Sequence, residues 1–267
     1  MIKVGILGAN GRMGRVLIDA VYQHSHVALG FASVRSGSSF IGMDAGELAG
    51  VAKQYVKVCA LEASLLNNAD VLVDFTLPEA LADNLNLAVS NNSPIVIGTT
   101  GLLPGQLALI DEAAKKIPVV FAANYSVGVN VMLNLVKQTA SIMGEQSDIE
   151  IVEAHHRFKK DAPSGTAMAI GEAIADTLSR DLSQCAVYGR EGVTGERTRE
   201  TIGFATVRAG DIVGEHTAIF ASLGERIEIT HKASSRLTFA NGALSAAMWL
   251  KNQAPGLYTM QNVLGLK

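Results

Sequence analysis

The sequence predicts an α/β protein, in which a doubly wound parallel sheet is joined to a smaller α+β domain with a mostly antiparallel sheet. Short apolar runs alternate with helical patterns through residues 1–126, which is typical of strand–helix–strand units. A glycine-rich turn directly follows the first of these runs. Beyond residue 143 the runs become rich in β-branched residues and are separated by short polar turns, which favours antiparallel strands.

Length and composition narrow the class of protein. The chain has 267 residues, 48% of them hydrophobic, and a net charge of −3, so it is long enough for two modest domains. That charge argues against a protein that grips nucleic acid through bulk positive charge. No apolar run reaches membrane-spanning length, and no basic leader precedes the first strand. Cys59 and Cys185 have no metal-binding spacing, which favours buried free thiols in a reducing compartment. We therefore expect a soluble, cytoplasmic protein.

The first elements predict a dinucleotide-binding turn. A strand over Ile2–Leu7 and a helix over Arg15–His24 flank three glycines spaced as G-x-x-G-x-x-G. Gly8 and Gly11 allow the backbone to turn and approach a pyrophosphate, and Gly14 allows the helix to pack close on the strand. The diphosphate would lie at the helix N-terminus. This Rossmann-like arrangement predicts a cofactor site that includes Gly8, Ala9, Asn10, Gly11, Arg12 and Met13.

The region after the second predicted strand, Val27–Ser33, bears on the choice of cofactor. A fold that prefers NAD often has an acidic residue at the end of this strand, but no carboxylate lies between Ala28 and Ile41. Arg35 and several serines occupy the region instead. A cation with hydroxyl groups suits a 2′-phosphate, so we expect NADPH as the preferred cofactor, with NADH possible. Alternatively, Arg35 is an ordinary loop residue that stacks on the adenine without selecting.

The rest of this half continues the alternation. The predicted elements are strands at Val56–Cys59, Val71–Asp74, Ile95–Ile97 and Val119–Ala122, and helices at Pro78–Ser90 and Gln106–Lys115. In doubly wound sheets ligands bind at the carboxyl ends of the strands. Residues at two of these ends are therefore further cofactor candidates, although each could also be a plain turn residue: Gly98, Thr99, Thr100, Ala122, Ala123, Asn124 and Tyr125.

The second half has a different architecture. Its predicted elements are helices at Val127–Met143 and Gly165–Leu182, and strands at Asp148–Glu153, Thr201–Arg208, Ile212–Ser222 and Arg226–His231. The last three strands are expected to form hairpins, because short glycine-containing turns separate them. The polar segment Arg190–Arg199 is expected to be a mobile loop. A final helix, Leu237–Leu250, could return to the first domain. The expected domains are residues 1–126 with 237–267, and residues 127–236.

A concentration of basic side chains lies between the strand Asp148–Glu153 and the helix Gly165–Leu182. Two histidines, an arginine and two lysines occupy the six residues from His155 to Lys160, and a Pro-Ser-Gly-Thr turn follows. Cationic side chains and a helix N-terminus together indicate a site for an anionic ligand, and histidines add proton transfer near neutral pH. Each feature alone has a plainer explanation, because adjacent strand residues face opposite ways, lysine pairs are usually solvated, and serine or threonine often caps a helix.

These stretches together resemble one known family. The motifs are Val4–Gly14, Asp74–Thr76, Gly98–Gly101, Ala123–Ser126, Glu153–Ala167 and His231–Arg236. They are similar to those of the 4-hydroxy-tetrahydrodipicolinate reductases, also called dihydrodipicolinate reductases, and the resemblance covers essentially the whole chain. Two positions depart from the family pattern: Val34 stands where many members have an acidic residue, and Phe158 stands where a third histidine is common.

The resemblance implies an enzyme of the bacterial diaminopimelate and lysine pathway. Such an enzyme delivers a hydride from NAD(P)H to ring carbon C4 of a cyclic imine dicarboxylate after water has left. The resemblance implies His155 as the acid/base group and Lys159 as the proton donor. It also implies a homotetramer built through the substrate-domain sheets. The substrate-binding residues that it implies are His156, Lys159, Gly165 and Thr166, with Ser164 and Arg236 close by.

Three rival interpretations fit less well. An acylating semialdehyde dehydrogenase needs a nucleophilic cysteine, and neither Cys59 nor Cys185 lies at a predicted strand end or beside a base. A non-catalytic NADP-binding sensor would keep the glycine turn and lose the basic cluster, which is intact here. A metal held by His155 or His156 with Asp161 is disfavoured, because adjacent histidines on a strand seldom share a metal. We therefore expect no metal.

Overall fold

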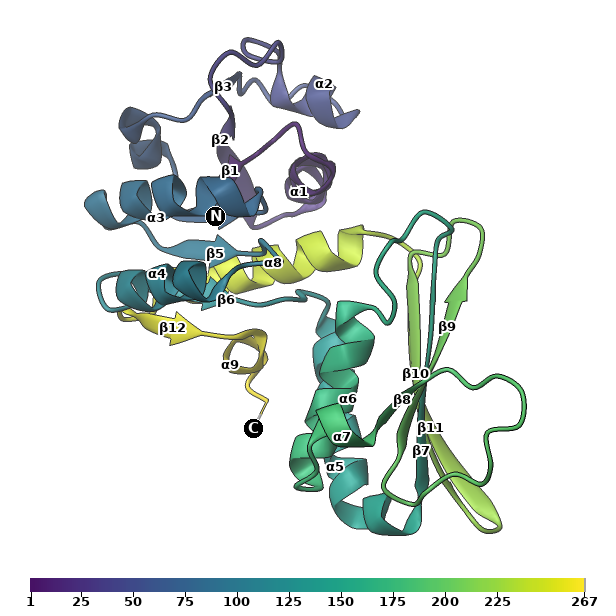
Figure 1. Cartoon of the computed structure of the whole chain (residues 1–267). Coiled ribbons are helices and arrows are strands. Elements are labelled where there is room, and N and C mark those ends of the chain that lie inside the picture. The colour runs from purple at the N-terminus through teal and green to yellow at the C-terminus, as the bar shows by residue number, and fades with distance from the viewer. Residues whose placement is uncertain (267) are drawn as a thin grey trace. The chain divides into compact units, whose positions relative to one another are not determined.

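The computed structural model describes residues 1–266 and divides the chain into two compact units (Figure 1). Unit 1 comprises Met1–Val127 and Arg236–Lys267, and unit 2 comprises Gly128–Ser235. Unit 2 is therefore a continuous segment inserted between two segments that fold together. No helix within residues 1–266 is long and apolar enough to cross a membrane.

Unit 1 is built on a seven-stranded sheet in which every neighbouring pair of strands is parallel. The strand order is β12-β6-β5-β4-β1-β2-β3. Because the strands are parallel, their carboxyl ends meet at one edge, where ligands bind in such sheets. The strands are β1 (Ile2–Leu7), β2 (Val27–Val34), β3 (Val58–Ala60), β4 (Val71–Asp74), β5 (Ile95–Ile97), β6 (Pro118–Phe121) and β12 (Gly256–Tyr258).

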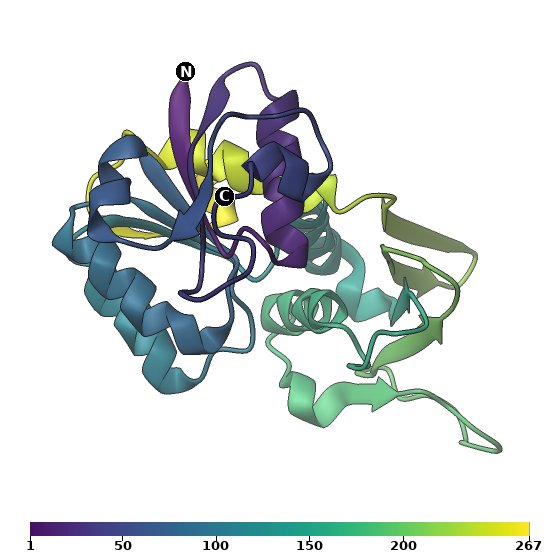
Figure 2. The same cartoon turned by 90° about the horizontal axis from the view of Figure 1, so that it is seen from above.

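Helices cover both faces of this sheet, so alternate strand residues enter two separate cores. Val71 and Val73 of β4 pack into the core that includes α1 and α8, whereas Leu72 packs into the core of α3 and α4. Helices α1 and α8 lie side by side (Figures 1 and 2). The helices of unit 1 are α1 (Arg12–Gln23), α2 (Ala45–Ala49), η1 (Ala63–Asn68), η2 (Pro78–Ala80), α3 (Leu81–Ser90), α4 (Pro104–Ala114), α8 (Leu237–Leu250) and α9 (Met260–Leu264).

Small side chains allow α8 to approach the sheet closely. Ala240, Ala243 and Ala247 are fully buried, and a Cβ atom at Gly242 would lie 1.8 Å from the carbonyl oxygen of Tyr125. The helix contacts β4, β5 and β6 as well as α1. The predicted return of Leu237–Leu250 to the first domain is confirmed, and the segment is an integral part of the core of unit 1.

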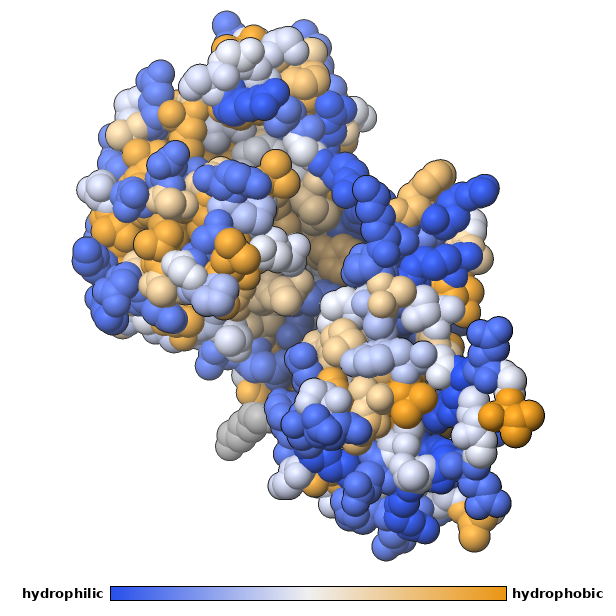
Figure 3. Space-filling model, in the orientation of Figure 1, coloured by the Kyte–Doolittle hydropathy of each residue, from blue (hydrophilic) through white to orange (hydrophobic). Residues whose placement is uncertain are grey.

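The surface of unit 1 carries some exposed leucines. Figure 3 shows hydrophobic residues on the side where α3 and α4 lie, and Leu103, Leu107 and Leu109 at α4 are all exposed. Scattered apolar side chains are normal on protein surfaces.

Cys59 and Cys185 are free and half-buried rather than buried as expected, and burial raises the pKa of both thiols.

Unit 2 contains a five-stranded mixed sheet, with strand order β11-β10-β7-β9-β8. Helices α5 and α6 pack on one face of it, where Ile149 and Ile151 of β7 are fully buried (Figure 1). Its elements are α5 (Val127–Met143), η3 (Gly144–Gln146), β7 (Asp148–His155), α6 (Gly165–Thr177), α7 (Leu182–Cys185), β8 (Ala186–Tyr188), β9 (Ile202–Arg208), β10 (Gly214–Ser222) and β11 (Glu225–Ala233).

Three expectations for unit 2 are wrong. β9 and β10 do not form a hairpin, because β7 lies between them and pairs with β9 in parallel and with β10 in antiparallel orientation. Only β10 and β11 form the predicted hairpin, and the sheet is mixed rather than mostly antiparallel. The predicted helix Gly165–Leu182 also ends early, at Thr177, since Ser179 adopts a left-handed backbone conformation with φ 54°.

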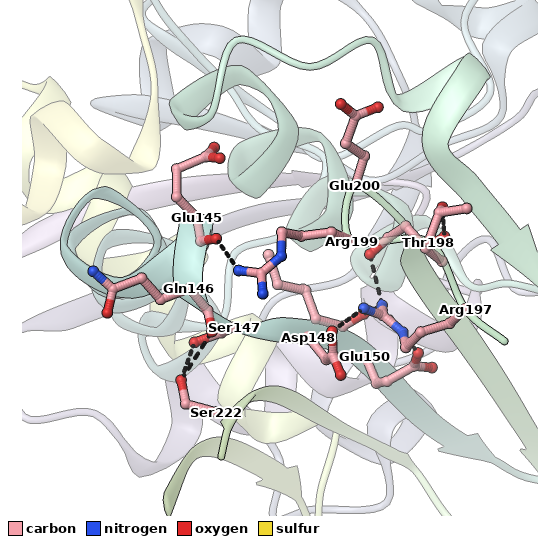
Figure 4. Close-up of polar contacts among 12 residues, drawn as sticks. Glu145, Gln146, Ser147, Asp148, Glu150, Arg197, Thr198, Arg199, Glu200 and Ser222 are labelled. Carbon is pink, nitrogen blue, oxygen red and sulfur yellow. Dashed lines mark hydrogen bonds and ion pairs between the residues drawn. The ribbon is translucent and has the colours of Figure 1, made fainter.

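The segment Arg190–Arg199 contains no helix or strand, and arginines tie its second half to the start of β7 (Figure 4). Arg197 lies 2.5 Å from Asp148 and donates to the carbonyl oxygen of Thr201 at 2.8 Å. Arg199 donates to the carbonyl oxygen of Glu145 at 2.9 Å. The mobility of this loop stays a prediction.

Candidate active site

A cavity of about 720 Å³ lies at the carboxyl ends of β1, β2, β4 and β5 in unit 1. The edge of the parallel sheet and the start of α1 form it. Most of the predicted cofactor residues line this cavity: Gly8, Asn10, Gly11, Arg12, Met13, Arg35, Gly98, Thr99 and Thr100. The volume suits a ligand of cofactor size.

The glycines of the first turn bring α1 close to β1. Gly8 has φ +72°, and a Cβ atom there would lie 2.8 Å from the Thr76 side chain. A Cβ atom at Gly14 would lie 2.2 Å from the carbonyl oxygen of Gly8, so only glycine fits at this crossing. The predicted reason for Gly14, close packing of helix on strand, agrees with this geometry.

Backbone hydrogen bonds fix the turn before α1. The Ala9 amide donates to the Ser33 carbonyl at 2.8 Å, and the Gly11 amide donates to the Gly8 carbonyl at 3.0 Å. Arg12 and Met13 begin the helix, where amides have no partner within the helix, and both line the cavity. Ala9 itself is fully buried. The start of α1 therefore offers an anion site at Arg12 and Met13.

The charge of the cavity is positive. Arg12 and Arg35 line it and are exposed, and none of the described lining residues is acidic. Val34 ends β2 with its side chain buried, so no carboxylate occupies the position that would accept from ribose hydroxyls. The residues present therefore fit a dinucleotide with an additional phosphate.

A buried aspartate, to which no role was assigned from the sequence, supports the turn after β4. Asp74 is fully buried and accepts from the Thr76 amide at 2.8 Å, the Thr76 hydroxyl at 2.6 Å and Asn84 at 2.8 Å. Burial raises the pKa of Asp74, although these hydrogen bonds oppose the shift. Thr99 in turn donates to the Thr76 carbonyl at 3.1 Å. This network holds Thr76 and Thr99 at the cavity wall.

The remaining cofactor candidates, Ala122–Tyr125, do not line this cavity. Tyr125 is 2% exposed, and its hydroxyl lies 2.8 Å from the Ile97 carbonyl oxygen and 3.1 Å from that of Val120. Burial raises the pKa of its phenol well above the ordinary value. Asn124 accepts from the Ser126 amide at 2.8 Å, while Ala122 is half-buried and Ala123 is exposed. Any contact of Tyr125 with a cofactor would involve its backbone.

In unit 2, the end of β7 places an imidazole beside a carboxylate. Strand alternation directs Glu153 and His155 to the same buried face, where they are 1% and 8% exposed. His155 Nδ1 lies 2.5 Å from Glu153 Oε2. Burial lowers the pKa of His155, which the Glu153 carboxylate opposes and the charges of Lys159 and Arg208 reinforce. A lowered pKa favours the neutral ring at pH 7, which is suited to exchange a proton.

The residues of the basic cluster, from His155 to Lys160, differ in how far they are exposed to solvent. The Lys159 side chain is 21% exposed and forms an ion pair of 2.9 Å with Asp161. Arg157, Phe158 and Lys160 are exposed. His156 is half-buried, and its Nδ1 is buried without a hydrogen-bond partner among the described residues. The charge of the partly buried Lys159 acts on His155, whereas Arg157 and Lys160 are exposed.

The N-terminus of α6 adjoins this pair. Ser164 is the N-cap, and its hydroxyl accepts from the Ala167 amide at 3.2 Å. Gly165 and Thr166 form the first turn, at the positive end of the helix dipole. A Cβ atom at Gly165 would have nothing within 4 Å, so there is open space above this turn. A carboxylate would be stabilised there.

Three residues without a predicted role complete the arrangement: Glu153, Arg208 and His216. Arg208 donates to both oxygens of Glu153, at 2.9 and 2.8 Å, and the carboxylate raises the pKa of its guanidinium. His216 Nε2 lies 3.0 Å from Ser164 Oγ, and burial, followed by the charge of His155, lowers the pKa of His216 to about 4. Arg208 faces His155 in the β7–β9 register, so a correct strand pairing would have revealed it.

Two other expectations concern Arg236 and metals. Arg236 is the half-buried N-cap residue of α8 in unit 1. Within residues 1–266, no group of three or more His, Cys, Asp or Glu side chains is placed to hold a metal ion.

Comparisons with known proteins agree with this arrangement. Two family models cover nearly the whole chain: "Dihydrodipicolinate reductase, N-terminus" matches residues 2–125 and "Dihydrodipicolinate reductase, C-terminus" matches residues 128–264. Two relatives named 4-hydroxy-tetrahydrodipicolinate reductase align over 100% of both chains. The protein from Pseudoalteromonas atlantica is 64% identical and that from Hahella chejuensis is 57% identical.

Solved structures show the same fold. A dipicolinate-bound dihydrodipicolinate reductase from Paenisporosarcina sp. TG-14 has a TM-score of 0.76 at 24% identity and covers 97% of each chain. An amine dehydrogenase from Mycobacterium smegmatis has a TM-score of 0.61 at 13% identity and covers 97% of this chain and 95% of its own. These two likenesses concern the fold alone, whereas the family models and the full-length relatives identify the family. The chain belongs to the dihydrodipicolinate reductase family, as its motifs predicted.

Proposed function

We propose that this protein reduces 4-hydroxy-tetrahydrodipicolinate to tetrahydrodipicolinate, with loss of water, in diaminopimelate and lysine biosynthesis. Family membership supports the reaction. The observation that carries the site assignment is the neutral His155 imidazole near Lys159 and the N-terminus of α6. A ring dicarboxylate needs both anion-binding groups and a proton source, and this part of unit 2 offers both.

Each residue has a distinct proposed role. The N-terminus of α6 at Gly165 and Thr166, together with His156, binds a substrate carboxylate. The reduced nicotinamide supplies the hydride, which goes to ring carbon C4. Hydride addition to a conjugated imine leaves negative charge on the ring, and the Lys159 ammonium stabilises that charge and donates the proton. His155 acts as the acid/base group, since its neutral ring accepts or returns a proton near pH 7.

We infer that NADPH is the preferred cofactor and that NADH is a weaker substitute. The start of α1, at Arg12 and Met13, would hold the diphosphate. Arg35 then binds the 2′-phosphate, which is supported by the acid-free lining of the cavity and by the buried Val34 at the end of β2. Gly98, Thr99 and Thr100 line the same cavity and would contact the cofactor further along the sheet edge.

We also propose that the protein works in the cytoplasm as a homotetramer, without a nucleic-acid or membrane partner. The net charge of −3 supports a small-molecule enzyme over a nucleic-acid binder. Contact between copies through the sheet of unit 2 is supported by the location of α5 and α6 on only one of its faces. Analytical ultracentrifugation would detect a species of four chains, and a monomer at all concentrations would contradict this.

A coupled assay tests the function. The substrate is generated enzymatically in the cuvette, and oxidation of NADPH is followed by the loss of dihydronicotinamide absorbance. We expect oxidation that requires the substrate, and competition by dipicolinate, the ligand in the Paenisporosarcina structure. Lys159→Ala should lower kcat by about 100-fold or more, as expected for loss of a general acid.

Lys160→Ala is the matched control, because Lys160 is the neighbouring lysine and is exposed. It should leave kcat near that of the unmodified protein, and NADPH binding should stay normal in both variants. Substrate-independent oxidation, or equal loss of activity in the two lysine variants, would refute the assignment.

A further inference from the structure

Glu153 occupies a central position in the buried part of the candidate site. It is 1% exposed, yet both of its carboxylate oxygens are hydrogen-bonded. Oε2 is bonded to His155 at 2.5 Å and to Arg208 at 2.9 Å. Oε1 accepts from the Ser164 amide at 3.1 Å and from Arg208 at 2.8 Å. One carboxylate thus links the proposed acid/base group to the N-cap of the helix proposed to bind the substrate.

We propose that Glu153, held by Arg208, is the positioning residue of this active site: it sets the tautomer of His155 and anchors the first turn of α6. The inference rests on the proposed catalytic role of His155 and deepens it. Glu153 is hydrogen-bonded to His155 and to the Ser164 amide, so it acts on the site through these two residues.

The tautomer follows from hydrogen-bonding capacity. An ionised carboxylate only accepts hydrogen bonds, so the neutral ring of His155 carries its proton on Nδ1 and leaves a lone pair on Nε2. A Cβ atom at Gly214 would lie 3.1 Å from Nε2, so the glycine leaves room beside this nitrogen. Nε2 is therefore the atom that exchanges a proton. A histidine whose partner selects the other tautomer loses most of its ability to act as a base.

Arg208 makes the buried carboxylate compatible with the fold. An unpaired charge at this depth would be strongly destabilising, and the two-pronged contact with Arg208 compensates it. Burial alone would raise the pKa of Glu153, but the hydrogen bonds from Arg208 and His155 lower it overall. Arg208 also donates to the Asp161 carbonyl at 2.6 Å, which ties the loop after His155 to the same pair.

The charged and titratable groups around His155 predict opposite changes in its pKa when Glu153 or Arg208 is replaced. They are Glu153 on β7, Arg208 on β9, His216 on β10 and Lys159 in the following loop. Glu153 raises the pKa of His155, whereas Arg208 and Lys159 lower it. Removing the carboxylate should therefore lower the pKa of His155, and removing the guanidinium should raise it.

The test combines histidine NMR with kinetics on the full chain. In Glu153→Gln, the neutral ring of His155 should move its proton from Nδ1 towards Nε2, which ¹⁵N chemical shifts report, and its pKa should fall. We expect kcat to fall by about 100-fold or more while the KM for NADPH stays unchanged. In Arg208→Gln, the carboxylate remains and the pKa of His155 should rise, which keeps the inference testable if the first variant folds poorly.

Glu150→Gln is the matched control. Glu150 lies on the other face of β7, and Arg190 contacts it through both guanidinium nitrogens at 2.9 and 2.8 Å. Loss of the Glu150 carboxylate should change neither the NMR signals of His155 nor kcat. A His155→Gln, Glu153→Gln double variant should have the kcat of His155→Gln alone, because Glu153 acts on the chemistry through that ring.

The possible results separate this inference from the proposed function. Unchanged tautomer and pKa of His155 in folded Glu153→Gln would overturn the positioning role. A changed tautomer with unchanged turnover would instead refute His155 as the acid/base group, and the positioning role for catalysis would fall with it. The anchoring of α6 through Ser164 should change the KM for the substrate rather than kcat. A further loss of kcat in the double variant would therefore contradict the inference.

Discussion

At the scale of single residues, the identity of each side chain at the sheet edge of unit 1 decides which anion can bind. Arg12 begins α1, and Arg35 follows β2, so the two guanidinium groups belong to different parts of the cavity wall. Arg12 is close to helix amides that suit a diphosphate. Arg35 occupies the region where an NAD-preferring fold often has a carboxylate.

Replacing Arg35 tests that distinction. Arg35→Ala should weaken NADPH binding by roughly 10- to 100-fold, the usual worth of a hydrogen bond to a charged group, and should change NADH binding little. Arg12→Ala is the control and should weaken the binding of NADPH and NADH to a similar extent. Dissociation constants from fluorescence titration of both cofactors provide the measurement. Equal losses for the two cofactors in Arg35→Ala would assign Arg35 to adenine stacking.

At the scale of elements, the crossing of α1 over β1 determines where the amides of the helix start. Gly14 is buried in the first turn of α1, and its missing side chain lets the helix approach the turn at Gly8. Any larger residue must move the helix, because the contacting atoms are backbone. Stability and cofactor binding are therefore coupled at this residue.

Gly14→Ala should destabilise unit 1 by about 1–3 kcal/mol, since overpacking here meets backbone that cannot rotate away. The substitution should also weaken the binding of NADPH, because it displaces the start of α1. Gly105→Ala is the matched control: Gly105 lies in the first turn of α4 with nothing within 4 Å of a Cβ atom. That change should be neutral or stabilise by about 0.4–1 kcal/mol. Urea denaturation compares the two, and equal effects would contradict the argument.

The element scale also shows what sequence patterns could predict. The strand Val71–Asp74 and the helices Val127–Met143 and Leu237–Leu250 were predicted with the bounds that the structure has, because each is a strongly patterned apolar segment. The short elements α7, β8 and β12 were not predicted. The β9–β10 hairpin was wrong because a short turn is a local signal, whereas the position of β7 between them depends on pairing across the chain.

The same limit applies to the candidate site. The basic cluster and the glycine turn are local in sequence, so they could be predicted as anion sites. The contact of Arg208 with Glu153 joins residues 55 positions apart, and it depends on β9 lying beside β7. The burial of Tyr125 and Asp74 likewise depends on packing between distant segments, which a local sequence pattern does not show. The roles proposed for His155, Lys159 and the cofactor residues stay predictions.

At the scale of the whole molecule, a buried histidine makes the stability of unit 2 depend on pH. The buried histidine of unit 2, His216, has its pKa lowered from 6.5 to about 4 by burial and by the charge of His155. Between these values the unfolded chain binds more protons than the folded one, so the free energy of unfolding falls as pH is lowered from about 6.5 to about 4. The loss is on the order of 3 kcal/mol. Glu153, whose pKa is also lowered, adds a loss of the same sign in stronger acid.

This acid sensitivity is measurable unit by unit. Trp249 is the only tryptophan and lies in α8, so its fluorescence reports unit 1, while NMR signals of β7 and β10 report unit 2. Denaturant titrations from pH 7 to pH 4 should show a pH-dependent transition for unit 2. His216→Gln should flatten that dependence because the titrating ring is gone. An unchanged slope in this variant would show that other groups cause the acid sensitivity.

The insertion of unit 2 within unit 1 has a consequence for synthesis on the ribosome. The core of unit 1 includes Ala243, Leu244 and Leu250 of α8, which emerge from the exit tunnel only after all of residues 128–235. Unit 2 is continuous and can complete its fold first, while the nascent amino-terminal strands wait, with apolar surface uncovered, for their last helix. Chaperone contacts during translation should therefore concentrate on the strands made first.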